Sequence, residues 1–356
     1  MGKLEITLNK IETIDAGLME KAQKRLDNLT KPQGSLGRLE EIAKQIVAMT
    51  RNENPKFENK VIFTLAGDHG VTQEGVSAFP QEVTPQMVYN FLKGGAAINV
   101  LARHVGSRVI IVDMGVASDV DVRKLDTKNF RDKKIAFGTK NFTKGPAMTK
   151  VEAVKSIEAG IEVFEDEYKN GIDIAGTGDM GIGNTTASSA ITAVITGKAV
   201  DEVTGRGTGI DDKALVHKAE VIKRAIEVNK PDPKDPIDVL SKVGGFEIGG
   251  LSGIILASAA HKIPVVIDGF ISGSAALLAY KLQPKVKGYM LASHCSVEKG
   301  HRIVLNFIGL KPLLDFDMRL GEGTGAALGM GIAEAGIKIL TEMATFQSAG
   351  VSDNKK

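Results

Sequence analysis

Five short apolar runs, each ending in a polar or glycine-containing loop, most constrain how this chain can fold. They are rich in β-branched residues, and most are followed by a segment with helical periodicity. Near-continuous apolar runs are typical of strands buried on both faces, and their alternation with helices predicts an α/β fold with a doubly wound parallel sheet. The runs are residues 61–66, 109–113, 172–175, 264–267 and 288–292.

Helical periodicity opens and closes the chain. Within residues 3–50, Leu18, Ala22 and Leu26 recur at helical spacing before a turn at residues 31–35, and residues 324–344 are also helical in pattern. We therefore expect the first and last helices to pack together as a small appendage on the sheet domain.

Composition and charge exclude several classes of protein. Lys and Arg total 45 against 43 Asp and Glu, with no basic stripe, so we expect no nucleic-acid partner. The single cysteine, Cys295, excludes an intrachain disulfide framework. Residues 1–12 have no apolar signal-peptide region, and the apolar stretch 248–267 is interrupted by His261 and Lys262. These features predict a soluble, cytoplasmic protein with no membrane association.

Glycine is unusually frequent, at 40 of 356 residues, and it gathers in loops. The densest cluster, residues 176–186, follows an apolar run and precedes an Ala/Ser-rich helical segment, and a second cluster spans residues 205–209. Exposed glycine N–H groups at a helix N-terminus favour a phosphate, and Asn184, Thr185 and Thr186 add side-chain donors. The two clusters therefore predict an anion site.

An alternative to a simple phosphate site is a dinucleotide site. Gly176, Gly178 and Gly181 match the GxGxxG pattern, and Glu202 follows about twenty residues later, which would suit a Rossmann oxidoreductase. No strand pattern precedes Glu202, although a ribose-binding acid should end the second strand of such a unit. A nucleotide-binding sensor without catalytic activity is a third hypothesis.

Other polar residues lie beside predicted strand ends or helix starts. Glu322 stands between two glycines before an apolar helix, where it either caps the helix or acts as a general base. His69 follows the first run, where it is expected to serve a site. His294 and His301 flank Cys295, but contiguous residues rarely form a catalytic dyad, and no paired histidine spacing indicates a metal.

Several of these stretches together resemble the nicotinate-nucleotide–dimethylbenzimidazole phosphoribosyltransferase family over nearly the whole chain. Their order and spacing make the resemblance far more specific than any single glycine motif. The stretches are KPQGSLGRL (31–39), AGDHGV (66–71), GVSAFP (75–80), the glycine cluster 176–186, TGRGTG (204–209), SH (293–294) and RLGEGTG (319–325).

The resemblance implies an enzyme that moves the 5-phosphoribosyl group of nicotinate mononucleotide to 5,6-dimethylbenzimidazole with inversion at C1′. It implies a homodimer and no cofactor, and it assigns no residue as a metal ligand. It also implies a large Rossmann-like catalytic domain (51–329) and a small helical domain built from both termini (1–50 plus 330–356).

The resemblance also assigns roles to residues. Glu322 is implied to be the catalytic base, and Asp179, where many relatives carry Glu, a secondary base or an orienting group. A benzimidazole-type base is implied to bind at Ser77, Phe79 and Gln86. The remaining residues are implied to bind the nucleotide and its phosphate, and they are Gly181, Asn184, Gly207, Gly209, Lys218, Gly269 and Phe270.

Overall fold

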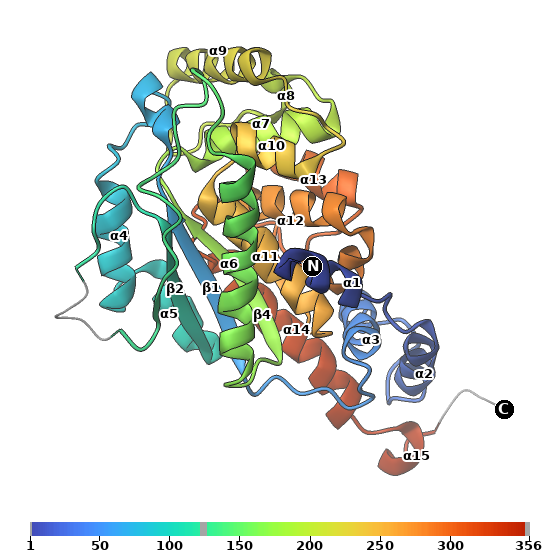
Figure 1. The fold of residues 1–356 in the computed structure, drawn as a ribbon. Helices are drawn as coiled ribbons and strands as arrows, with labels where there is room; N and C mark the ends of the chain where they lie inside the picture. Colours follow the sequence, from blue (N-terminus) through green and yellow to red (C-terminus); the bar gives the residue numbers. More distant parts are fainter. Residues whose placement is uncertain (1, 122–126, 353–356) are drawn as a thin grey trace.

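The protein is built on a six-stranded, all-parallel sheet. A computed structural model describes residues 2–121 and 127–352 (Figure 1). The strand order is β3-β2-β1-β4-β5-β6, so the direction of winding reverses between β1 and β4, where doubly wound sheets bind ligands. The strands are β1 (Lys60–Gly67), β2 (Ser107–Gly115), β3 (Phe130–Asp132), β4 (Ile174–Met180), β5 (Val265–Ile267) and β6 (Met290–Ala292).

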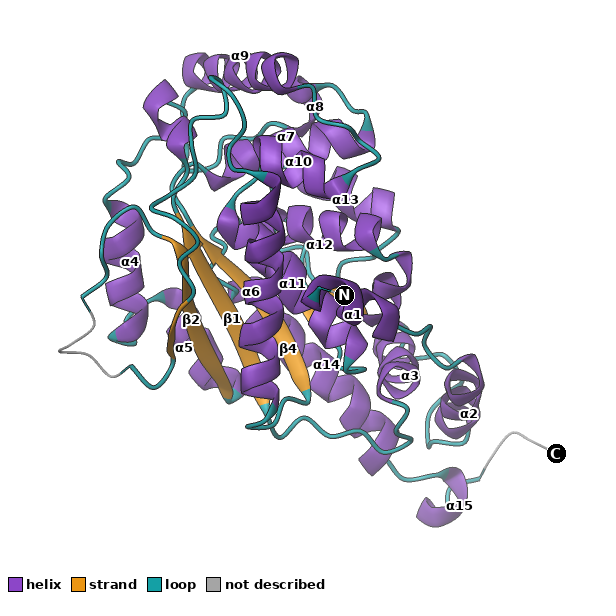
Figure 2. Ribbon diagram, in the orientation of Figure 1, coloured by secondary structure: helices purple, strands orange, loops and turns teal. Residues whose placement is uncertain are grey.

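Helices cover both faces of the sheet (Figure 2). One face of the sheet packs against α11, and α6 packs on the outside of α11. The other face packs against α14, and α4 and α5 lie beside β1 and β2. The α-helices are α1 (Lys3–Lys10), α2 (Ala16–Asp27), α3 (Arg38–Thr50), α4 (Val83–Leu92), α5 (Ala97–Val105), α6 (Lys150–Tyr168), α7 (Asn184–Thr196), α8 (Val200–Val203), α9 (Asp212–Asn229), α10 (Pro236–Val243), α11 (Phe246–Ala260), α12 (Phe270–Leu282), α13 (Lys299–Ile308), α14 (Thr324–Glu342) and α15 (Phe346–Ala349), and the 3-10 helices are η1 (Gly70–Glu74) and η2 (Pro284–Tyr289).

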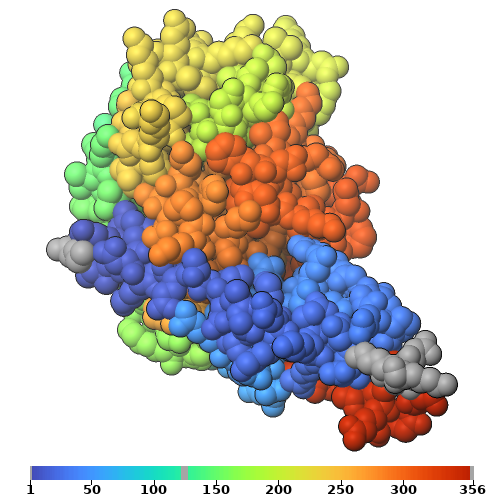
Figure 3. Space-filling model, turned by 90° about the vertical axis from the view of Figure 1, so that its right-hand side faces the viewer, coloured from blue at the N-terminus to red at the C-terminus, as the bar shows by residue number. Residues whose placement is uncertain are grey.

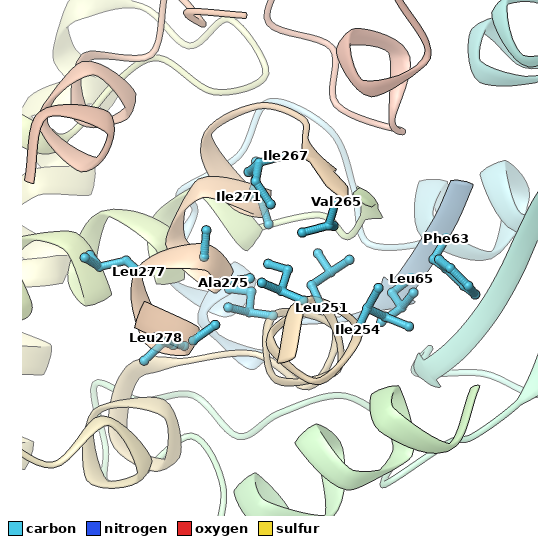
Figure 4. Packing of buried hydrophobic residues seen from close by; sticks show 14 of the residues in the cluster. Phe63, Leu65, Leu251, Ile254, Val265, Ile267, Ile271, Ala275, Leu277 and Leu278 are labelled. Atoms are coloured by element: carbon cyan, nitrogen blue, oxygen red, sulfur yellow. The ribbon is translucent and has the colours of Figure 1, made fainter. Parts of the chain in front are cut away.

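The predicted α/β class and parallel sheet are confirmed, and all five apolar runs contain strands. The apolar stretch 248–267 is the buried helix α11 followed by β5, as expected. Figure 4 shows Leu251 and Ile254 of α11 packed among side chains of β1, β5 and α12. Strand β3 was not predicted, because two half-buried residues and one exposed residue carry too short a pattern.

The predicted start of the glycine loop at Gly176 is wrong. Strand β4 continues to Met180, so Gly176 and Gly178 lie inside the sheet and form no phosphate-binding turn. A Cβ at Gly178 would lie 2.3 Å from the carbonyl oxygen of Glu322, and one at Gly176 would lie 2.8 Å from Cε of Met330. These two glycines allow α14 and the loop before it to approach the sheet closely.

The blue segment that contains α2 and α3 lies beside the red C-terminal segment at one end of the molecule (Figure 3). A small hydrophobic cluster joins α2 and α3 to Leu340 near the end of α14, whereas α1 packs against α6 and α11. Within the described part of the chain, no helix is both long and apolar enough to cross a membrane.

Candidate active site

A cavity of about 360 Å³ opens at the carboxyl ends of β4, β5 and β6. Its walls come from α4, from the loops after these strands, from the 205–209 loop and from the loop before α14. Ligands occupy this position in open α/β sheets. The lining residues are Phe79, Val83, Met87, Asp179, Met180, Gly181, Ile182, Asn184, Thr185, Gly207, Thr208, Gly269, Phe270, Ile271, His294, Ser296, Glu298, Arg319, Leu320, Gly321 and Glu322.

Glu322 is held at the cavity by its backbone. Its N–H donates to the carbonyl of Asp179 (3.2 Å), and its carbonyl accepts from Oγ1 of Thr64 (2.8 Å). Its φ of 64° lies in the left-handed region, which costs a non-glycine residue about 1–3 kcal/mol and is typical of functional sites. The carboxylate accepts one backbone N–H, from Ile98 (3.2 Å), and burial raises its pKa above 4.5.

Asp179, the second-last residue of β4, lies beside Glu322. Nδ2 of Asn184, at the start of α7, donates to its Oδ2 (2.9 Å), while Oδ1 has no hydrogen-bond partner among the described residues. Burial raises the pKa of Asp179 well above 3.8, and the nearby carboxylates of Asp268 and Glu247 raise it further. The raised pKa favours the protonated form more than in an exposed carboxyl, and a protonated carboxyl can donate a hydrogen bond.

Asp268, directly after β5, fixes the segment that follows Glu322. Its two carboxylate oxygens accept N–H groups from Gly323 (3.1 Å), Gly325 (2.7 Å) and Ala326 (3.1 Å), so they cap the N-terminus of α14. Burial raises its pKa to about 7, against the lowering effect of these donors. Asp268 was not among the predicted site residues, although an acid after a predicted strand was a signal for it.

Lys218 and Thr185 lie together on the side of the cavity for which the sequence predicts an anion. Lys218 itself does not line the cavity, but its buried Nζ donates to Oγ1 of Thr185 (2.8 Å), which does. Burial lowers the pKa of Lys218 to about 8, and the nearby Glu298 carboxylate opposes this. The charge thus stands directly behind a hydroxyl that faces the cavity.

The 205–209 loop differs from the predicted set of free donors. The N–H of Gly207 donates to Oε1 of Glu298 (2.8 Å), and that of Gly209 donates to the carbonyl of Arg206 (3.0 Å). Gly207 lines the cavity and Gly209 does not. The guanidinium of Arg319, which donates to the carbonyl of Gly207 (3.3 Å), is a cavity cation that the sequence reasoning did not select.

The opposite side of the cavity is apolar. Phe79, Val83 and Met87 line it from the start of α4 and the loop before this helix. Ser77 does not line the cavity but reaches Oγ1 of Thr208 (3.4 Å), so it joins the two loops. Gln86 is exposed on α4 and does not line the cavity, because Val83 and Met87 occupy the helix face that does.

Three comparisons with known proteins identify the family. A family model described as phosphoribosyltransferase matches residues 11–351. Two relatives are named nicotinate-nucleotide–dimethylbenzimidazole phosphoribosyltransferase. The one from Geobacter sulfurreducens is 58 % identical over 353 residues, which are 99 % of this chain and 99 % of the relative. The one from Geobacter metallireducens is 59 % identical over 355 residues, which are 100 % of this chain and 99 % of the relative. This chain belongs to that phosphoribosyltransferase family. A crystal structure of the enzyme from Thermus thermophilus is 41 % identical, covers 96 % of this chain and all of its own, and superposes with a TM-score of 0.90.

Membership of the phosphoribosyltransferase family excludes the oxidoreductase hypothesis, and the position of Gly176 and Gly178 inside β4 gives the physical reason. The predicted transferase class is confirmed. The relatives carry an enzyme's name over their full length, which also disfavours a non-catalytic sensor.

His69 and the thiol of Cys295 are buried and do not line the cavity. Nε2 of His69 lies 2.6 Å from Oε1 of the equally buried Glu247. Burial lowers the pKa of His69, but the Glu247 carboxylate outweighs this effect and the pKa is raised. Burial raises the pKa of the Cys295 thiol, which suits an inert side chain. Across residues 2–121 and 127–352, no cluster of three His, Cys, Asp or Glu side chains could hold a metal.

Proposed function

We propose that this chain transfers the 5-phosphoribosyl group of nicotinate mononucleotide to 5,6-dimethylbenzimidazole in cobalamin nucleotide-loop assembly. The products are α-ribazole 5′-phosphate and nicotinate. The observation that carries the proposal is the buried Glu322 carboxylate, held between an apolar wall on α4 and a polar wall backed by Lys218, in a chain of this family.

The chemistry needs one base and accurate positioning. One azole nitrogen attacks C1′ of the ribose while the bond from C1′ to the pyridinium nitrogen breaks, and the electron pair of that bond leaves with nicotinate. Attack opposite the leaving group converts the β-linkage to α. The other azole nitrogen loses its proton to Glu322, whose raised pKa makes it a stronger base than an exposed carboxylate.

Asp179 is proposed to orient the acceptor. Because its raised pKa favours the protonated form, Oδ1 can donate a hydrogen bond where Glu322 accepts a proton. Neighbouring carboxyl groups whose pKa values differ can act one as a hydrogen-bond donor and the other as a base. A role as secondary base would require Asp179 to ionise first.

The nucleotide is proposed to lie on the polar side of the cavity. Gly181, Asn184 and Gly207 would face its phosphate, with Lys218 supplying charge through Thr185. Because Glu298 occupies the N–H of Gly207, phosphate would gain this donor only when that bond opens. Gly209 would act from outside the cavity wall, and Gly269 and Phe270 would border nicotinate.

The acceptor base is proposed to lie against α4. Phe79 is half exposed at the cavity edge, where its ring can stack on a flat azole, and Val83 and Met87 supply apolar surface. Ser77 supports this wall through Thr208, whereas Gln86 would reach a base only from the outside.

We also propose that the protein is a cytoplasmic homodimer. Each chain would form a small domain from residues 1–50 and 330–356 and a large domain from residues 51–329. The cluster that joins α2 and α3 to Leu340 supports a small terminal domain, while α1 packs on the large one. Residues 1 and 353–356 lie outside the described part of the chain. Light scattering on the purified protein would measure twice the mass of 37.8 kDa for a dimer.

The proposal is tested by incubating the purified chain with nicotinate mononucleotide and 5,6-dimethylbenzimidazole. We expect equimolar nicotinate and ribazole phosphate by chromatography and mass spectrometry, with the α-anomer assigned by NMR. Parallel reactions with adenine and a phenol would define the base preference. Binding of the mononucleotide without turnover of any base would contradict the proposal and favour a sensor, and tight binding of NAD alone would also contradict it.

A further inference from the structure

His294 is a cavity residue to which the mechanism above gives no role. It follows β6, its ring is almost fully buried, and it lines the cavity. The ring stands between two glycines, since a Cβ at Gly325 would lie 2.1 Å from its Nδ1 and one at Gly269 would lie 3.8 Å from its Nε2. A side chain at Gly325 would therefore collide with this imidazole, whereas one at Gly269 would only contact it.

Hydrogen bonding around Ser293 sets the tautomer of His294. The hydroxyl of Ser293 lies 3.2 Å from the carbonyl oxygen of Asp268 and 3.0 Å from Nδ1 of His294. A carbonyl can only accept, so the single hydroxyl proton of Ser293 serves Asp268. Both contacts are then hydrogen bonds only if Nδ1 carries the proton and donates it to Ser293, which leaves Nε2 with a free lone pair.

Nε2 of His294 has no partner among the described residues. Its neighbour Gly269 lines the cavity, so Nε2 faces the side of the cavity formed by the loop after β5. Burial lowers the pKa of His294, which the carboxylate of Asp315 opposes, and the neighbouring His301 ring is also neutral because burial lowers its pKa to about 3. Oδ1 of Asp268 accepts the N–H of Gly325, so this carboxylate lies on the Gly325 side of the ring.

A neutral nitrogen with a free lone pair accepts hydrogen bonds and repels carboxylate and phosphate oxygens. It therefore suits neither the nicotinate carboxylate nor the phosphate. The azole N–H could donate to such a nitrogen, but the azole is proposed to lie against α4, beside β1. His294 and Gly269 follow β6 and β5, which lie on the opposite side of β4. The ribose hydroxyls are the donors that remain on the nucleotide side.

We propose that His294 is a positioning residue whose Nε2 accepts a hydrogen bond from a ribose hydroxyl of the nucleotide. This contact, which rests on the proposed function, would fix the sugar so that C1′ presents its α face to the acceptor base. Positioning of this kind contributes to transfer without any proton movement at His294.

The test combines two substrates with two variants. His294→Asn keeps an N–H near the position of Nδ1 and removes Nε2, whereas His294→Gln places an amide near the position of Nε2. Each enzyme is assayed with nicotinate mononucleotide and with its 2′-deoxy and 3′-deoxy analogues. In the wild-type enzyme we expect one analogue to lower kcat/KM about 10-fold, as for loss of one neutral hydrogen bond. His294→Asn should remove that penalty, and His294→Gln should keep part of it.

The outcomes separate the two proposals. If the wild-type enzyme turns over the parent nucleotide but His294→Asn keeps the full penalty for both analogues, the ribose contact is wrong. A changed KM for the base, with unchanged penalties, would overturn it in favour of an azole contact. If the wild-type enzyme shows no turnover of the parent nucleotide, the proposed function itself fails. Nitrogen NMR of labelled enzyme should show Nδ1–H and an unprotonated Nε2, and protonation at Nε2 would also overturn the inference.

Discussion

Replacing Gly178 with alanine should displace the loop that carries Glu322. The new Cβ would lie 2.3 Å from the carbonyl oxygen of Glu322 and 2.7 Å from the N atom of Gly323. Since close carbon–oxygen contacts in proteins lie at about 3.3–3.6 Å, this loop must retreat by about 1 Å. A misplacement of that size can reduce the rate about 10²-fold, so we expect kcat to fall by about that factor.

Gly176→Ala is the matched control, because it adds the same methyl group two residues earlier in β4. Its Cβ would meet only side chains, at 2.8 Å from Cε of Met330 and 3.1 Å from Cγ1 of Ile62. Such overpacking costs about 1–3 kcal/mol of unfolding free energy but leaves the Glu322 loop in place. We therefore expect lower stability with a kcat near that of the wild-type enzyme.

Steady-state kinetics and thermal denaturation of both variants separate the possibilities. A wild-type kcat in a folded Gly178→Ala enzyme would refute the claim that this glycine positions Glu322. A raised KM for the nucleotide with unchanged kcat would also refute it, because that result is expected of a phosphate-binding loop.

Three further predictions concern charge. Because burial raises the pKa of Glu322, kcat/KM should rise with pH along a limb whose apparent pKa exceeds 4.5, and a limb at or below 4.5 would contradict the assignment. Lys218, whose pKa is lowered to about 8, should lose its charge above pH 8. The KM for the nucleotide should therefore rise above that pH in the wild-type enzyme, whereas in Lys218→Met it should be high at every pH. Asp268→Asn replaces an oxygen that accepts an N–H with an amide donor, so chemical denaturation should show a loss of about 1.5–3 kcal/mol. The loss should be smaller for Asp173→Asn, because this half-buried side chain accepts its backbone N–H groups through Oδ2 alone and its amide can turn to keep an oxygen there.

The sequence was most informative where one local pattern sufficed. Apolar β-branched runs predicted five of the strands because strands buried on both faces need such residues. Glu322, between two glycines before a helix, was recognisable because that arrangement opens the chain to a ligand, and the structure places it at the cavity.

Contacts between distant segments could not be predicted in the same way. Gly176 and Gly178 looked like a loop, but their purpose depends on α14, about 150 residues later. Asp268 acquires its role only because β5 ends beneath the N-terminus of α14. The bond from Gly207 to Glu298 likewise joins segments 91 residues apart, so no local pattern reveals that this donor is occupied.

The most direct test of the catalytic claim is the rate of Glu322→Gln in forming α-ribazole 5′-phosphate. Glutamine keeps the size and can still accept the N–H of Ile98, but it cannot take a proton from the azole. With folding confirmed by circular dichroism, we expect kcat to fall by about 10²–10⁴. A rate near that of the wild-type enzyme would show that Glu322 is not the base.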